Sequence, residues 1–138
     1  MAYWILKTEP TTYSFDNLAA EQTARWDGVT NPVAVRNIRS MQKGDPVMIY
    51  HTGGEKAVVG LAEVASAPYE DPKDKSGRLF VVDLKAGQRL PRAVTLAEIR
   101  AEPVFKDMAL VRQPRLSVVP ADAAQWARLL AMAGSGSG

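Results

Sequence analysis

Residues 24–41, ARWDGVTNPVAVRNIRSM, carry the clearest structural signals in the chain. Asn31 stands at a favoured helix N-cap position and Pro32 at the first helical position, so the sequence predicts a helix that begins here. Three apolar residues follow at helical spacing and predict a buried face: Val35, Ile38 and Met41. Just before this helix, Trp26 is followed by an acid and a glycine, and we expect this tryptophan to lie on a loop.

Around this stretch, the sequence predicts about five strands and several short helices. Apolar runs rich in β-forming residues predict strands at residues 3–7, 46–52, 57–67, 78–88 and 114–120. Further helices are expected after Ser14, at the Thr95–Glu98 capping box and at residues 122–133, with a polar loop at 69–77. Strands do not alternate regularly with long helices, which argues against a doubly wound parallel sheet. The pattern favours an α+β fold, with a small, strongly bent mixed sheet or open barrel and short helices at its mouth.

Length and composition describe one globular domain that needs no disulfide or metal. The 138 residues are 46% hydrophobic and 23% charged, which are ordinary values for a single domain, here expected at residues 1–133. The Gly/Ser-rich end, residues 134–138, is expected to form a flexible tail. The chain has no cysteine and one histidine, so thiolate and multi-histidine metal sites are excluded. We therefore expect neither a metal nor a cofactor.

Charge and hydropathy point away from a membrane. The net charge is +2, and the basic excess is spread over the second half of the chain, which is compatible with nucleic acid without requiring it. No run approaches the roughly 20 apolar residues that a membrane-spanning helix needs, and the first residues do not read as a signal peptide. We expect a cytoplasmic monomer with no membrane partner, associated with the nucleoid if it binds DNA.

The sequence carries no catalytic signature. It lacks a nucleophile elbow, a phosphate-binding loop and a glycine-rich dinucleotide motif. The single histidine, His51, follows Tyr50 at a predicted strand end, and we interpret it as a structural or binding residue rather than a general base. An enzymatic alternative stays open, because Glu9 or Asp27 could face a bound base in a base-excising or strand-cutting reaction. The sequence favours a binding protein over an enzyme.

Four segments supply the parts of a pocket for a flat heterocycle: residues 7–10, Trp26, Asn31 and residues 50–51. Taken singly, each has a structural explanation, since a proline ends a strand, a tryptophan plugs a barrel end and an asparagine caps a helix. Together they offer an aromatic plane, hydrogen-bonding groups and the free N–H groups of a helix N-terminus. A base extruded from a nucleic acid needs this combination of stacking and edge contacts.

Four long motifs, in order along the chain, resemble the EVE domain of the PUA-like superfamily. They are YWILKTEPTTYSFDNL (3–18), WDGVTNPVAVRNIRSMQKGDPVMIYHT (26–52), VVGLAEV (58–64) and LVRQPRLSVVP (110–120). The resemblance implies a PUA-like open β-barrel of about five or six mixed strands, related to the YTH domains that hold a methylated base in an aromatic cage. It also implies a nucleic-acid-binding module that recognises a modified base, methylated or hydroxymethylated, flipped out of DNA or RNA.

The resemblance further implies which residues line the pocket. They are Lys7, Thr8, Glu9, Pro10, Ser14, Trp26, Gly28, Val29, Asn31, Tyr50, His51, Arg115 and Ser117. Trp26 would form the stacking wall. Asn31, Ser14 and the backbone around Val29 would contact the edge of the base. The residues implied to contact the nucleic-acid backbone are Lys7, Arg36, Arg39 and Arg115.

One segment departs from the family pattern. Where the family reads close to WDGVRNYQARN, this chain has Thr30-Asn31-Pro32-Val33, so an arginine and a tyrosine beside the pocket are replaced. The replacement and the modest net charge leave a second function open, a sensor for a nucleoside or similar small molecule that uses the same pocket without a polymer. DNA or RNA that carries a modified base is the partner that the resemblance favours.

Overall fold

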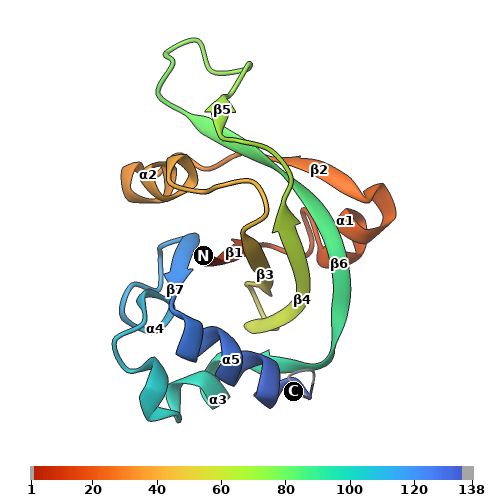
Figure 1. The fold of residues 1–138 in the computed structure, drawn as a ribbon, viewed down its shortest axis with the longest axis vertical. Coiled ribbons are helices and arrows are strands. Elements are labelled where there is room, and N and C mark those ends of the chain that lie inside the picture. Colours follow the sequence, from red (N-terminus) through yellow and green to blue (C-terminus); the bar gives the residue numbers. More distant parts are fainter. Residues whose placement is uncertain (1, 135–138) are drawn as a thin grey trace.

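The computed structural model describes residues 2–134, so the predicted flexible tail at 134–138 lies outside it except for Gly134. The strands are β1 (Tyr3–Thr8), β2 (Thr23–Trp26), β3 (Pro46–His51), β4 (Ala57–Val64), β5 (Tyr69–Glu70), β6 (Phe80–Thr95) and β7 (Val118–Ala121). The helices are α1 (Phe15–Glu21), α2 (Pro32–Arg39), α3 (Leu96–Arg100), the 3-10 helix η1 (Pro103–Phe105), α4 (Ala109–Arg112) and α5 (Ala123–Met132). Figure 1 shows the helices placed around one bent sheet.

The sheet is mixed and open. Six strands follow one another in the order β2-β6-β4-β3-β1-β7, and β5 pairs with β6. β1 and β3 run parallel, while the other neighbours run antiparallel. Between residues 2 and 134, no ladder joins the two end strands, β2 and β7, so the sheet does not close into a barrel. The predicted α+β fold with an open mixed sheet is confirmed, and seven strands take the place of the predicted five or six in this part of the chain.

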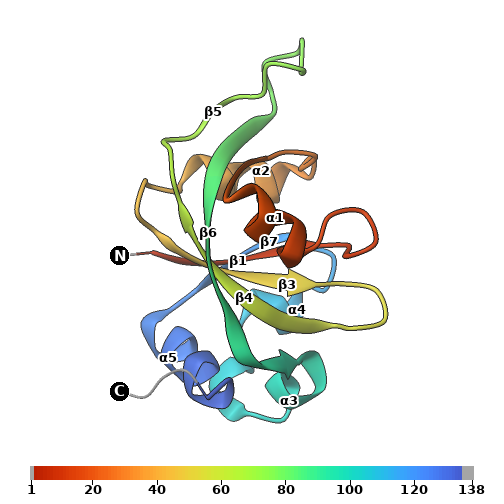
Figure 2. The same cartoon turned by 90° about the vertical axis from the view of Figure 1, so that its right-hand side faces the viewer.

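β6 is a long strand that links several parts of the sheet. It covers Phe80–Thr95, whereas the sequence predicts a strand that ends at residue 88, and it runs through most of the height of the molecule in Figure 2. Its pairing with β4 shifts register on both sides of Gly60. Such irregularities bend a strand and increase its twist. One continuous strand can therefore pair with β2 and β5 near its beginning and with the start of β4 at its end.

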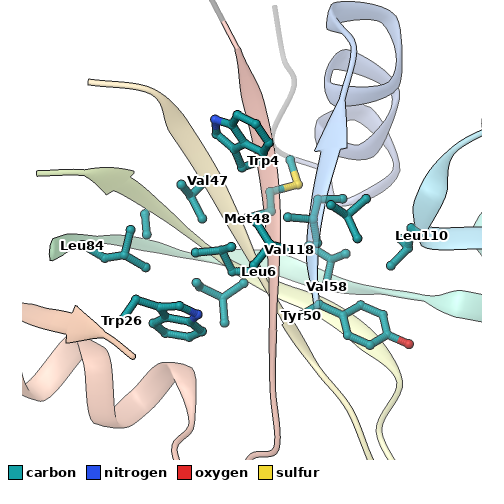
Figure 3. Packing of buried hydrophobic residues seen from close by; sticks show 14 of the residues in the cluster. Trp4, Leu6, Trp26, Val47, Met48, Tyr50, Val58, Leu84, Leu110 and Val118 are labelled. Carbon is teal, nitrogen blue, oxygen red and sulfur yellow. The ribbon is translucent and has the colours of Figure 1, made fainter. Parts of the chain in front are cut away.

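Trp26 lies on a strand, so the prediction that it lies on a loop is wrong. It is the last residue of β2 (TARW), where it stands opposite Val82 of β6. Its side chain is 7% exposed, and in Figure 3 it points from the end of β2 toward β1, the strand that carries Leu6. The segment TARW is only four residues long and has two polar side chains, so its sequence alone does not predict a strand. β2 forms because β6, far away in the sequence, supplies its hydrogen bonds.

Several other boundaries differ from the prediction. β5 lies inside the polar loop expected at 69–77, and β7 begins at Val118 rather than at residue 114. η1 and α4 were not predicted, because they are too short to show a periodic pattern. The helix predicted after Asn31 is confirmed as α2, and the Asn31 side chain accepts hydrogen bonds from two N–H groups of its first turn. In the described part of the chain, no helix is long and apolar enough to cross a membrane.

Helix α1 is fixed to the sheet at its first residue. Ser14 and Asn17 form a capping box at its start. The Phe15 N–H donates to Nε2 of His51, at the end of β3, over 2.9 Å. The Phe15 ring covers Gly60, where an added β-carbon would lie 2.3 Å from a ring carbon. A glycine in β4 therefore allows α1 to pack directly on the strand.

The hydrophobic core combines the inner face of the sheet with buried helix residues. Figure 3 shows side chains from β1, β3, β4 and β7 in contact at its centre. The face predicted for the second helix is confirmed, since Val35, Ile38 and Met41 are all buried. The buried carboxylate of Asp45 accepts a hydrogen bond from Nε1 of Trp4 over 3.0 Å and another from a backbone N–H. These partners offset the cost of placing a charge among apolar side chains.

Replacing Gly60 with alanine tests the contact between α1 and β4. The new methyl group would overlap the Phe15 ring, and we expect Gly60→Ala to lower the free energy of unfolding by about 1–3 kcal/mol, the usual cost of overpacking. Gly54→Ala is the matched control, because a β-carbon at Gly54 meets no atom within 4 Å. Urea denaturation of both variants measures the difference. Equal stability of the two variants would contradict this packing.

Candidate functional site

A cavity of about 670 Å³ lies where the sheet fails to close, between β2 on one side and the end of β1 with its following loop on the other. We call it the edge pocket. Its walls are formed by Lys7, Thr8, Thr12, Tyr13, Glu21, Thr23, Ala24, Arg25, Trp26, Asp27, Gly28, Val29 and Ser117. The volume is within the range of sites that bind small molecules or single groups of larger ones.

The free edge of β2 presents unpaired backbone groups at the edge pocket. The Ala86 N–H donates to the Gln22 carbonyl oxygen over 2.8 Å, and this bond fixes the even-numbered residues of β2 as those bonded to β6. The N–H and C=O groups of Thr23 and Arg25 therefore point away from β6. Within residues 2–134 these groups have no hydrogen-bond partner. Such an edge can pair with any ligand that carries a matching donor and acceptor.

Two aromatic rings stand in the wall of the edge pocket. Trp26 and Tyr13 meet edge to face, with ring centroids 6.1 Å apart and an interplanar angle of 78°. The Tyr13 hydroxyl donates a hydrogen bond to a carboxylate oxygen of Glu21. Burial, together with this hydrogen bond, raises the pKa of Tyr13. The phenol is therefore uncharged at neutral pH, and the hydrogen bond holds its ring across from Trp26.

The formal charges in the pocket wall balance. Lys7 and Arg25 are cationic, and Glu21 and Asp27 are anionic. Burial lowers the pKa of Lys7, whose Nζ donates to the backbone oxygen of Pro114 over 2.9 Å. A wall with balanced charge, aromatic surface and polar groups suits a flat, neutral ligand better than it suits an isolated phosphate.

The edge pocket brings together part of the residue set that the family resemblance implies. These residues are Lys7 and Thr8 from β1, Trp26 from β2, Gly28 and Val29 after it, and Ser117 before β7. Gly28 has a φ of +79°, a left-handed conformation that glycine adopts without steric cost. The chain can therefore turn directly after Trp26 and place Val29 in the same wall.

The other residues expected near the end of β1 hold the loop instead of lining the edge pocket. The carboxylate of Glu9 accepts hydrogen bonds from Thr11 and Thr52. The bond from the Thr11 backbone is the main cause of the lowered pKa of Glu9. Ser14 caps α1, and Pro10 lies in the turn between them. These residues act on the pocket by fixing where α1 begins.

His51 and Tyr50 are also outside the pocket wall. His51 is 4% exposed, and its Nε2 accepts the Phe15 N–H, so Nδ1 carries the proton and donates to Glu55 over 2.7 Å. Both ring nitrogens therefore bond within the fold. Figure 3 shows Tyr50 on the other side of β1 from Trp26.

The remaining predicted residues line two neighbouring hollows. Asn31 and Arg115 line one of about 280 Å³. Arg36 and Arg39 line another of about 540 Å³, between α2 and the loop that joins β5 to β6. The residues that the resemblance groups into one site thus do not share one cavity.

Part of the pocket wall carries little sequence signal. The residues that the sequence analysis does not single out are Thr12, Tyr13, Glu21, Thr23, Ala24 and Arg25. Tyr13 is an aromatic residue inside the first family motif, which is the one signal that could have marked it. The residues of β2 have none, because only the pairing with β6 shows that they form an edge.

The open mixed sheet, with short helices and a cavity at its unclosed edge, fits the PUA-like fold that the sequence motifs imply. A family model of the EVE domain matches residues 2–132, and the chain belongs to the EVE-domain family. The family that the sequence motifs predict is therefore confirmed.

Similar proteins agree with this placement. The NMR structure of a protein from Rhodopseudomonas palustris is 40% identical, with a TM-score of 0.92 over 97% of this chain and 94% of that one. Human thymocyte nuclear protein 1 is 26% identical in an alignment of 153 positions, gaps included, that covers 86% of this chain and 68% of the human protein. A crystal structure of that human protein in complex with DNA containing 5-methylcytosine is 24% identical, with a TM-score of 0.88 over 96% of this chain and 98% of that one. At this identity the crystal structure shows a shared fold.

Removing the acceptor at His51 tests its structural role. His51→Phe leaves the buried Phe15 N–H without a partner, and we expect the free energy of unfolding to fall by about 1–3 kcal/mol. His51→Gln can place an amide oxygen near the position of Nε2, so this variant should recover part of the loss. Urea denaturation measures both effects. If His51→Phe is as stable as the wild type, the hydrogen bond does not hold α1 in place.

Proposed function

We propose that this protein binds nucleic acid and accepts one modified base, flipped out of its strand, in the edge pocket. The observation that carries the proposal is the free edge of β2, whose residues Thr23 and Arg25 have backbone groups that β6 leaves unpaired and line a cavity walled by Trp26 and Tyr13. A flipped base has a flat ring that can lie against an aromatic wall. It also has an edge of donors and acceptors that must be satisfied once it leaves its pairing partner.

The backbone of Arg25 suits such an edge. Its N–H and its C=O lie on the same side of β2, at the spacing that a neighbouring strand would meet. A base that has a donor next to an acceptor on its pairing edge can occupy the same position. In this proposal the backbone of β2 forms hydrogen bonds with the edge of the base, and the side chains of the pocket wall fix the plane of its ring.

We propose 5-methylcytosine as the first base to test, because the human relative has been solved with DNA that contains it. Ala24 and Val29 are apolar residues of the pocket wall and offer contacts to a methyl group. Glu21 and Asp27 offer carboxylate acceptors, which are natural partners of the cytosine amino group.

We propose binding without catalysis. Of the two acids considered for a base-excising or strand-cutting reaction, Asp27 lines the edge pocket, while Glu9 is bonded to Thr11 outside its wall. The second carboxylate in the wall, Glu21, already accepts the Tyr13 hydroxyl. This arrangement supports a site that holds a base over one that attacks it.

A nucleoside sensor is the second candidate function. The balanced charges of the pocket wall favour a neutral ligand and do not by themselves require a polymer. Thr30 also stands where the family pattern has an arginine. A sensor would bind a free nucleoside as tightly as it binds the same nucleoside within an oligonucleotide.

Matched oligonucleotides test the proposal against the sensor. We expect fluorescence anisotropy to show tighter binding of DNA with one 5-methylcytosine than of the same DNA without it, and an affinity that falls as salt concentration rises. The free nucleoside should bind more weakly than the modified DNA. Equal affinities for unmodified DNA and for a panel of methylated and hydroxymethylated bases would rule out a reader of modified bases. Nucleoside binding as tight as that of DNA would favour the sensor.

Trp26→Phe trims the pocket wall and keeps an aromatic ring in the core. Stacking of a base on an aromatic side chain is worth about 1–3 kcal/mol, so losing part of the ring should weaken binding of the modified DNA about three- to tenfold. Trp126→Phe on α5 is the matched control, because the Trp126 ring packs against Tyr3, with centroids 5.1 Å apart, and does not line the edge pocket. If Trp26→Phe binds the modified DNA as tightly as the wild type does, the Trp26 ring does not contribute to binding of the base.

A further inference from the structure

The hollow of about 540 Å³ between α2 and the loop at residues 71–79 forms a second candidate contact, which we call the arginine cleft. It is lined by Thr30, Pro32, Val35, Arg36, Arg39, Asp74, Ser76, Arg78 and Leu79. In Figure 1 both α2 and this loop lie toward the upper end of the molecule, and α3 lies at the opposite end.

The arginine cleft is positively charged. Arg36 and Arg39 lie one turn apart on α2, and Arg78 comes from the loop. Across residues 2–134, the ion pairs of the structure involve none of these three side chains. The guanidinium carbon of Arg39 lies 4.5 Å from the ring centroid of Phe80, a contact that helps to hold this side chain beside the cleft. The three guanidinium groups are therefore available to an anion.

The acid in the cleft wall, Asp74, is committed to the loop. Its oxygens accept hydrogen bonds from the Ser76 hydroxyl over 2.8 Å, and from the N–H groups of Arg78 over 3.0 Å and Leu79 over 2.8 Å. These bonds, with that of Leu79 first, lower the pKa of Asp74. Asp74 therefore fixes the backbone that carries Arg78 and leaves the guanidinium group free.

The arginine cleft adjoins the edge pocket. Val29 lines the edge pocket, and the next residue, Thr30, lines the cleft. Because the Cα atoms of consecutive residues are about 3.8 Å apart, the two walls meet at this point of the chain. The loop also reaches the rim of the edge pocket, where Nζ of Lys73 lies 3.9 Å from a carboxylate oxygen of Asp27. A polymer with one base in the edge pocket would carry its backbone past the cleft.

We propose that the arginine cleft binds a phosphate group of the strand, next to the flipped nucleotide. Guanidinium groups suit phosphate because they offer several N–H donors in a fixed plane. The two walls differ in charge. The charges of the edge pocket balance, which suits an uncharged base, whereas the arginine cleft is cationic, which suits the phosphate backbone of the nucleic acid. This inference rests on the proposed function. It adds Arg78, which no sequence signal marks, to Arg36 and Arg39 as a backbone contact.

Charge-removing variants test the cleft, with one probe that has no base at the target position. Arg78→Gln and Arg36→Gln each remove one charge from the cleft. Arg100→Gln is the matched control, because it removes one charge from α3 at the far end of the molecule. The probes are a DNA strand with one 5-methylcytosine and the same strand with an abasic site at that position. Anisotropy is measured over a series of NaCl concentrations, and thermal denaturation checks that each variant is folded.

Each cleft variant is expected to weaken binding of both strands about fivefold and to reduce the slope of log affinity against log salt by about 0.7, the value for one single-strand phosphate. Arg100→Gln is expected to match the wild type. Cleft variants that behave like Arg100→Gln would overturn the inference, as would a wild-type protein that does not bind the abasic strand.

The inference and the proposed function fail in different ways. If the wild type shows no preference for 5-methylcytosine but the cleft variants bind the abasic strand more weakly than the wild type does, the phosphate site is supported and the proposed binding of a modified base is wrong. If the wild type prefers 5-methylcytosine and the cleft variants bind both strands as tightly as the wild type does, the proposed binding of a modified base is supported and the phosphate site is wrong.

Discussion

The sheet stops at β2, and the edge pocket lies beside this open edge. A strand edge with free N–H and C=O groups usually attracts another strand, and most proteins cover it or break it with charges. In this protein the edge faces a cavity of the molecule itself. Because the even-numbered residues of β2 bond to β6, the backbone groups of Thr23 and Arg25 are left over for a ligand. Under the proposed function, recognition through backbone atoms would mean that the identity of those two side chains reveals little about the ligand.

Helix α1 sets the distance between the two walls of the edge pocket. The chain leaves β1, forms α1 and returns as β2, so the position of α1 controls where the free edge lies. The Phe15 ring on Gly60 and the Phe15 N–H on His51 fix the start of this helix to β4 and β3. Glu9 holds the preceding turn in the same way. These motif residues are therefore bonded or packed within the fold, and under the proposed function they would support the edge pocket without contacting the base.

Features that depend on neighbouring residues could be predicted from the sequence, and features that depend on distant ones could not. The Asn31 cap and the buried face of α2 follow from local hydrogen bonding and helical spacing, and both are confirmed. The sequence does not predict β2 because the strand is formed through its pairing with β6. For the same reason the sequence predicts a loop at Trp26, where the structure has a strand. Resemblance to the family supplied the fold and a list of residues. Contacts in three dimensions were needed to separate Trp26, which lines the edge pocket, from His51, which bonds within the fold.

Amide hydrogen exchange along β2 can show whether a base binds at the free edge. In the free protein, the N–H groups of Thr23 and Arg25 have no partner and should exchange quickly, while that of Ala24 is bonded to β6 and should be protected. When the protein is saturated with DNA that contains 5-methylcytosine, we predict slower exchange at Arg25 or Thr23 and no change at Ala24. Exchange at both Thr23 and Arg25 that stays as fast as in the free protein would contradict binding of the base to the edge of β2.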